Sequence, residues 1–165
     1  VRARYERERR RNLLAQPGPG ELILVLDHLK PGFNVAKIFR SAQAFGVREL
    51  HLIDIGPFDP APAKGAMRAV PARFFGTLDE SMERLAAADY RVFRMVADGG
   101  PALQRFRLPR RCALVLGHEE FGLSAAATSL PALTIAQWGR VQSLNVSIAA
   151  SIAMYEYVRQ HPGLC

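Results

Sequence analysis

Apolar residues along the chain fall into short continuous runs, separated by longer stretches in which they recur every three to four positions. Short runs are typical of buried strands, and the longer spacing is typical of helices with one apolar face. Gly46 directly follows one helical stretch, where glycine commonly ends a helix. The predicted strands span residues 21–26, 50–53, 91–96, 112–116 and 133–135, and the predicted helices span residues 2–14, 35–45, 78–88 and 144–160. This alternation predicts an α/β fold, a mostly parallel sheet with helices on both faces.

One segment of the chain has the composition of a linker. Residues 17–20 read Pro-Gly-Pro-Gly, which interrupts regular structure. We therefore expect residues 1–20 to form an N-terminal arm and linker, and residues 21–165 to form one domain. Residues 54–72 are expected to be a loop with one short helix, and residues 97–110 an irregular segment with one helical turn.

The predicted final helix is apolar on two sides. One stripe consists of Leu144, Ile148, Ile152 and Tyr155, and a second consists of Val146, Ala150, Ala153 and Tyr157. A helix of this kind must be buried twice. Two alternatives account for the pattern: burial of both stripes inside one domain, or a symmetric dimer formed through the helix.

The charge of the chain is concentrated at its start. The formal net charge is +7, and residues 1–11 hold six arginines and two glutamates. A basic arm favours a polyanionic partner, because cationic side chains displace counterions from phosphates. The alternative is a solvated terminal helix without a partner.

Other features of the composition narrow the class of protein. Nearly half of the residues are apolar, and no run approaches the roughly 20 apolar residues that cross a bilayer. Two cysteines, Cys112 and Cys165, make no disulfide framework, so we expect a cytoplasmic protein. The four histidines lack a partner at metal-ligand spacing, and no metal site is expected.

Three segments carry polar residues in positions that suggest chemistry. In residues 34–46, Asn34 is well placed to cap the helix, and Arg40 points away from the apolar stripe. In residues 114–124, a hydrophobic strand leads into Gly117 and Glu119. In residues 139–147, small polar residues stand where the last helix is expected to begin. Each segment has a purely structural alternative, as a cap, a solvated arginine or a tight turn.

Taken together, the three segments resemble motifs of the SPOUT superfamily of RNA methyltransferases, in its TrmH (SpoU-like) branch of ribose 2′-O-methyltransferases. The first segment is similar to an N-x-x-x-x-x-R motif, through Asn34 and Arg40. The second is similar to a G-x-E-x-x-G-L-S motif, through Gly117, Glu119, Gly122, Leu123 and Ser124. The third is similar to an S-L-N-V-S motif, through Gln142, Ser143, Leu144, Asn145, Val146 and Ser147.

The resemblance implies a deep C-terminal trefoil knot, a homodimer through the C-terminal helix and S-adenosylmethionine as cofactor. Periodicity alone argues against a knot, since knots are nearly absent from known folds. The cofactor is expected in the knotted loops, against Val96, Ala97, Leu116, Gly117, His118, Glu119, Ile135, Ala136, Gln137, Ser143 and Leu144.

Two short stretches depart from the family pattern. The family commonly has Ile-Pro-Met in its third loop, where this chain has Ile135, Ala136 and Gln137. A small residue often follows the glutamate of the second motif, where this chain has Glu120 and Phe121. Both departures lie beside the expected cofactor or substrate, so they bear on the shape of the pocket.

By resemblance, Arg40 acts on the ribose 2′-hydroxyl. Arginine stays charged throughout the accessible pH range, which favours electrostatic stabilisation of the alkoxide over a role as a neutral base. Asn34 is expected to orient Arg40 or the ribose, and Glu119 to hold Arg40 by a charge-assisted bond. Ser143 and Asn145 are expected to shape the cofactor end of the site.

The expected partner is a structured RNA, either tRNA or rRNA, and the third motif favours tRNA. Phosphate contacts are expected from Arg2, Arg4, Arg7, Arg9, Arg10, Arg11, Lys30, Lys37, Lys64 and Arg68. Two alternatives stay open: a base methyltransferase on the same fold, and a non-catalytic RNA-binding module. A nucleotide-binding Rossmann domain is disfavoured, because the chain has no G-x-G-x-x-G or Walker loop.

Overall fold

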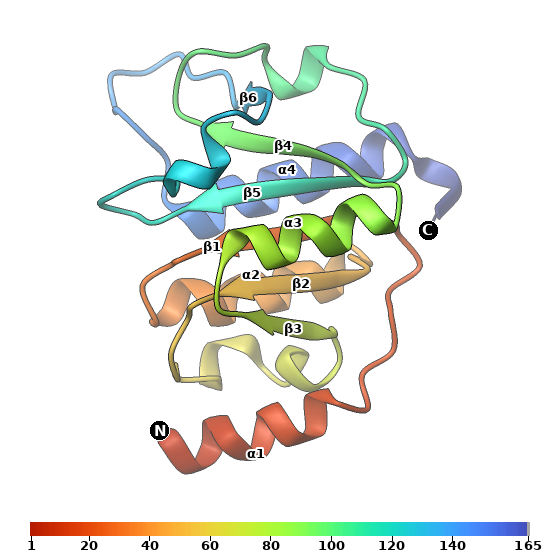
Figure 1. The fold of residues 1–165 in the computed structure, drawn as a ribbon, viewed down its shortest axis with the longest axis vertical. Helices are drawn as coiled ribbons and strands as arrows, with labels where there is room; N and C mark the ends of the chain where they lie inside the picture. The colour runs from red at the N-terminus through yellow and green to blue at the C-terminus, as the bar shows by residue number, and fades with distance from the viewer. Residues whose placement is uncertain (165) are drawn as a thin grey trace.

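Six parallel strands form a single sheet at the centre of the molecule. A computed structural model describes residues 1–164, and Cys165, which enters the predicted domain and the cysteine argument, lies outside them. The strand order is β3-β2-β1-β5-β4-β6 (Figure 1). The strands are β1 (Ile23–Asp27), β2 (Glu49–Ile53), β3 (Ala72–Phe75), β4 (Arg91–Val96), β5 (Cys112–Gly117) and β6 (Ala132–Thr134). The prediction of a parallel α/β sheet is confirmed.

Helices cover both faces of this sheet, as predicted. In Figure 1, α3 lies in front of the sheet, and α2 and α4 lie behind it. Leu24 and Leu26 of β1 pack into the larger core with α2 and α4, whereas Ile23 and Val25 pack into the smaller core with α3. The helices are α1 (Arg2–Asn12), α2 (Phe33–Ala44), α3 (Leu78–Ala87) and α4 (Val146–Gln160). Short 3₁₀ turns are η1 (Ala61–Ala63), η2 (Ala66–Arg68), η3 (Leu103–Arg105), η4 (Ala125–Ala127) and η5 (Pro162–Leu164).

Strand β3 was not predicted: residues 54–72 were expected to be a loop with one short helix, and no element was assigned to residues 73–77. The strand is only four residues long, and its side chains are exposed or half-buried. It forms because β2 supplies a parallel partner, from Leu50 opposite Ala72 to Ile53 opposite Phe75. A short edge strand of this kind has no long apolar run for a periodicity argument to detect.

Two predicted helix starts are wrong by one or two residues, and each changes the role of a polar side chain. Helix α2 begins at Phe33, so its N-cap is Gly32 and Asn34 does not cap it. Helix α4 begins at Val146, so its N-cap is Asn145, whereas Leu144 precedes the helix. Asn145 caps through its side-chain oxygen, which accepts from the backbone N–H groups of Ser147 and Ile148. Gly46 has a φ of +64° directly after α2, which confirms the predicted helix end.

Helix α1 is packed against the domain and does not extend into solvent. Its Tyr5 ring is buried, with the centroid 5.1 Å from that of Phe58. Asn12, also buried, donates from Nδ2 to the carbonyls of Met67 and Val70 and accepts at Oδ1 from the N–H of Ala72. The helix therefore lies beyond the β3 edge of the sheet (Figure 1).

The two apolar stripes of α4 have different surroundings. The stripe with Ala150, Ala153 and Tyr157 is buried in the larger core. On the other stripe, Ile148 is 52% exposed and Tyr155 is 59% exposed. The alternative in which one domain buries both stripes is therefore wrong, and the dimer stays a prediction.

A buried polar network joins β2 and the edge strand β3 to α3. His51 is fully buried, with Nδ1 2.7 Å from Ser81 Oγ and Nε2 2.9 Å from Glu49 Oε1. Arg73 donates to the other Glu49 oxygen at 3.0 Å. Burial opposes ionisation of Glu49, but the hydrogen bonds from His51 and Arg73 outweigh it and lower the pKa of this carboxyl to about 2.

Candidate functional site: a pocket at the carboxyl ends of the strands

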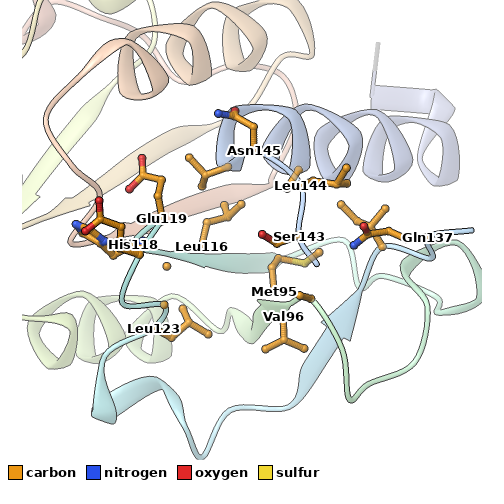
Figure 2. Close-up of a pocket in the computed structure, with 17 residues that line it drawn as sticks. Met95, Val96, Leu116, His118, Glu119, Leu123, Gln137, Ser143, Leu144 and Asn145 are labelled. Atoms are coloured by element: carbon orange, nitrogen blue, oxygen red, sulfur yellow. Dashed lines mark hydrogen bonds between the residues drawn. The ribbon is translucent and has the colours of Figure 1, made fainter. Parts of the chain in front are cut away.

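A pocket of about 520 Å³ opens at the carboxyl ends of β4, β5 and β6, where ligands bind in sheets of this type. Three segments distant in sequence meet there: the end of β4, the loop after β5, and the chain from β6 to the start of α4 (Figure 2). The lining residues are Met95, Val96, Ala97, Leu116, Gly117, His118, Glu119, Glu120, Gly122, Leu123, Ile135, Gln137, Ser143, Leu144, Asn145, Val146 and Ala149.

Ten of the eleven residues predicted to bind the cofactor line this pocket, and Ala136 does not. The prediction missed Met95, Glu120, Gly122, Leu123, Val146 and Ala149. Gly122 and Leu123 belong to the quoted second motif, so their presence in the pocket had a sequence signal. Val146 belongs to the quoted third motif and had the same kind of signal, whereas Ala149 had none, because it lines the pocket only through the way in which α4 approaches β5.

The loop after β5 is a tight turn that brings backbone to the pocket wall. His118 and Gly122 exchange two backbone hydrogen bonds of 2.8 Å. A Cβ atom at Gly117 would lie 2.5 Å from the carbonyl carbon of Gly122, so this close approach requires glycine. Nδ1 of His118 accepts from the N–H of Glu120 at 3.0 Å, which leaves Nε2 as the protonated ring nitrogen.

A chain of hydrogen bonds joins the three motifs at the rim of the pocket. Glu119 accepts at Oε1 from Asn34 Nδ2, 3.1 Å away, and at Oε2 from the backbone N–H of Lys30 at 3.2 Å. Asn34 in turn accepts at Oδ1 from Asn145 Nδ2 at 3.2 Å. The oxygen of the Asn145 side chain caps α4, so its amide is held in one orientation. The second motif is therefore fixed against the first and the third.

Arg40 lies outside this network. It is exposed on α2 and is not among the residues that line the pocket. The expected bond between Glu119 and Arg40 is not formed among residues 1–164; Glu119 accepts from Asn34 and from the backbone N–H of Lys30 instead. Asn34 likewise contacts Glu119 and Asn145, and does not orient Arg40.

A buried carboxylate behind the second motif was not anticipated. Asp27 ends β1, opposite Gly117 of β5, and is fully buried. Its Oδ2 accepts from the N–H of Ser124 at 2.7 Å, and its Oδ1 lies 2.7 Å from Nδ1 of His28. The residue thus holds the far end of the loop that borders the pocket. The sequence did contain a signal for this residue, an aspartate at the end of an apolar run, but from the sequence alone it was not interpreted as part of the site.

Every basic side chain predicted to contact RNA is exposed. On α1, Arg2 pairs with Glu6 at 3.3 Å and Arg11 pairs with Glu8 at 3.3 Å. Arg9 lies over the Phe74 ring at 4.1 Å, which adds a contact between α1 and β3. Among residues 1–164, no helix has the length and hydropathy to cross a membrane, and no group of three His, Cys, Asp or Glu side chains is arranged to hold a metal ion.

A parallel α/β sheet with a pocket of ligand size at the carboxyl ends of its strands has the architecture of a ligand-binding α/β protein. The sequence signature of the SpoU rRNA Methylase family matches residues 21–155. The chain belongs to this family, which confirms the resemblance of its three motifs.

Individual relatives show the same likeness. The chain is 32% identical over 148 residues to the 23S rRNA (guanosine-2′-O-)-methyltransferase RlmB of Nitrosomonas europaea, with 85% of this chain and 56% of that protein covered. The chain thus spans about half the length of this curated relative. The SpoU methyltransferase AviRb of Streptomyces viridochromogenes, solved in complex with AdoMet, is 25% identical with a TM-score of 0.79, over 88% of this chain and 62% of that one.

A second solved structure has nearly the same length as the matched part of this chain. This structure is described as giving structural insights into the 2-OH methylation of C/U34 on tRNA. Its sequence is 31% identical to this chain, and the two folds align with a TM-score of 0.76. The match covers 88% of this chain and 99% of that chain. The match therefore spans nearly the whole of that solved chain.

Proposed function

We propose that this protein transfers a methyl group from S-adenosylmethionine to a ribose 2′-hydroxyl of tRNA or rRNA. The observation that carries the proposal is the pocket, with the hydrogen-bonded Glu119, Asn34 and Asn145 at its rim. The relatives support it, because RlmB is named as a guanosine 2′-O-methyltransferase and AviRb was solved with AdoMet.

The pocket fits this cofactor in size and in the distribution of polarity. Its volume of about 520 Å³ lies in the range of roughly 300–1,000 Å³ typical of small-molecule sites. A Cβ atom at Gly117 would meet the backbone of Gly122 and Leu123, so glycine there allows the tight turn that brings backbone groups to the pocket wall. Bound there, the cofactor supplies a methyl group already activated on a sulfonium, so the protein needs to position the acceptor oxygen and help it to lose its proton.

We assign stabilisation of the developing alkoxide to the guanidinium of Arg40. Because Arg40 lies outside the pocket of its own chain, we propose that it acts at the pocket of a second copy. Arg40 precedes Ser41, whose hydroxyl lies 2.8 Å from that of Ser151 on α4. It is therefore close to the exposed stripe of α4, the surface through which we propose that the homodimer forms.

The RNA is proposed to bind through the basic arm and through Lys30, Lys37, Lys64 and Arg68, with residues 1–20 as an arm on the domain of residues 21–165. Exposure of these side chains supports phosphate contacts, which position an RNA without reading its sequence. The protein is proposed to act in the cytoplasm.

We also propose the trefoil knot that the family resemblance implies. The segments proposed to cross, after Leu116 and before Leu144, both border the pocket. Pulling the two ends of a single molecule apart tests this. A knotted chain unfolds to a contour shorter than its residue number requires, whereas an unknotted chain reaches full length.

Methylation of RNA with labelled S-adenosylmethionine tests the activity. Purified protein is incubated with tRNA and rRNA from a strain that lacks the gene, and the product is digested with alkali. A 2′-O-methyl group removes the nucleophile for alkaline cleavage, so the label is expected in an alkali-resistant dinucleotide. Label in a mononucleotide base identifies a base methyltransferase, and failure to bind the cofactor identifies a non-catalytic RNA-binding module. Either result contradicts the proposal.

A further inference from the structure

The side-chain oxygen of Gln137 has no hydrogen-bond partner among residues 1–164, although the residue lines the pocket. Its Oε1 is buried and accepts no hydrogen bond from any group of residues 1–164. A buried amide oxygen without a partner is rare and costly, because water cannot compensate it. The hydrogen-bonding capacity of Oε1 is therefore unused among these residues, and because Gln137 lines the pocket, a rotation of its terminal amide would turn Oε1 toward a bound ligand.

The two ends of the pocket differ in polarity. At one end lie His118 and Glu119, and at the opposite end lies Gln137 (Figure 2). The apolar side chains of Met95, Val96 and Leu144 lie on the Gln137 side of His118 and Glu119 in Figure 2, and Ile135 also lines the pocket. The charged methionine moiety of the proposed cofactor favours the polar end, because an apolar wall would remove its hydration without replacement. The adenine ring then occupies the end at Gln137.

We infer that the Gln137 side chain recognises the adenine base of the cofactor. A carboxamide offers one acceptor and one donor, and adenine presents the complementary 6-amino donor beside a ring-nitrogen acceptor. The apolar side chains around Gln137 exclude water and cover the faces of the ring.

This inference rests on the proposed function and identifies a specificity-determining residue of the same site. The methionine that the family commonly has at this position would offer no hydrogen bond. In this chain, the side chain of Gln137 therefore contributes a hydrogen-bonding contact to the adenine base.

Calorimetric titration with two ligands tests the inference. One ligand is S-adenosylhomocysteine, and the other is its analogue with hydrogen in place of the 6-amino group. The wild-type protein is expected to bind S-adenosylhomocysteine about tenfold more tightly than the analogue, as amide–adenine pairs discriminate. Gln137→Leu and Gln137→Met are expected to lose most of that preference, mainly by binding S-adenosylhomocysteine more weakly.

Gln104→Leu is the matched control, because Gln104 is exposed in η3 and does not line the pocket. It is expected to keep the wild-type preference. Thermal unfolding of each variant verifies folding, and Gln137→Met serves where Gln137→Leu is unstable.

A wild-type protein that binds both ligands equally overturns the inference, as does a folded Gln137 variant with the full preference. These outcomes leave the proposed function intact, because the cofactor still binds. If neither ligand binds the wild-type protein, the proposed cofactor is wrong, and the inference is wrong with it.

Discussion

Asn12 makes the connection between α1 and the sheet edge, and removing its side chain tests how that connection stabilises the protein. All three of its hydrogen-bonding positions are used, two as donors to the carbonyls of Met67 and Val70 and one as acceptor from Ala72. The distances to Val70 and Ala72 are 2.6 and 2.9 Å. Met67 and Val70 are buried, so the backbone groups released by a substitution do not readily find water.

The expected cost follows from these three bonds. A hydrogen bond contributes a net stabilisation of about 0.5–1.5 kcal/mol, and a buried group left without a partner costs about 1–3 kcal/mol. Asn12→Leu keeps the approximate volume and removes all three bonds. We expect the free energy of unfolding to fall by about 3 kcal/mol, which for a chain of this size lowers Tm by about 6–12 °C.

Urea unfolding followed by circular dichroism measures the total change, and amide hydrogen exchange locates it. Faster exchange is expected in residues 2–12 and 66–75, while β1 and β5 stay protected. The control Glu6→Gln removes only the exposed ion pair with Arg2 and is expected to change stability by less than about 0.5 kcal/mol.

Asn12→Asp tests the two hydrogen bonds that Asn12 donates separately from the one that it accepts. It keeps an oxygen for the Ala72 N–H but sets a carboxylate against two carbonyls. It is therefore expected to be more destabilising at pH 7 than at pH 4, where the carboxyl takes up a proton. An Asn12→Leu variant within about 0.5 kcal/mol of wild type, with unchanged exchange, would refute this account of α1.

Four further predictions follow from the same structure. The folded-state pKa of Glu49 is lowered to about 2 from 4.5, so its contribution to the stability of the fold is complete above pH 4.5 and is lost as the pH falls toward 2. Urea unfolding at a series of pH values should show a loss of about 3 kcal/mol over this range. A free energy of unfolding that does not change over this range contradicts the prediction. Arg40→Ala should reduce methyl transfer more than tenfold while cofactor affinity in calorimetry stays within about twofold; turnover above a tenth of wild type excludes the proposed role. Ile152→Glu puts a charge into the exposed stripe of α4 and should convert a dimer into monomers in sedimentation; an unchanged mass places the interface elsewhere. Arg4→Gln with Arg10→Gln keeps α1 packed and should lower the salt slope of RNA binding by about 1.5, whereas an unchanged slope removes the arm from the RNA interface.

Truncation of the arm would be a poorer test of RNA binding than these substitutions. Residues 1–14 include Tyr5 and Asn12, which belong to the packed structure. Their removal would expose Phe58 and the backbone of Met67 and Val70. A loss of RNA affinity would then report partial unfolding as well as lost charge.

The order of strands and helices was largely readable from sequence because it depends on local patterns. The four strands predicted before residue 120 follow from continuous apolar runs, and the two stripes of α4 follow from the 3.6-residue period of a helix. The family followed from three short motifs, because their residue types and order are specific even where each motif alone is weak. Eleven cofactor positions could be named on that ground, although their placement around one pocket required the fold.

The features that only the tertiary structure determined are contacts between residues far apart in the chain. Strand β3 forms only because β2 lies beside it, and Glu119 accepts from Asn34 only because the loop after β5 reaches the start of α2. Arg40 shares a motif with Asn34, and helix geometry already predicted that it points away from the apolar stripe, but its place outside the pocket required the fold. Residue patterns report which side of an element is buried; what that side contacts depends on the packing of the whole chain.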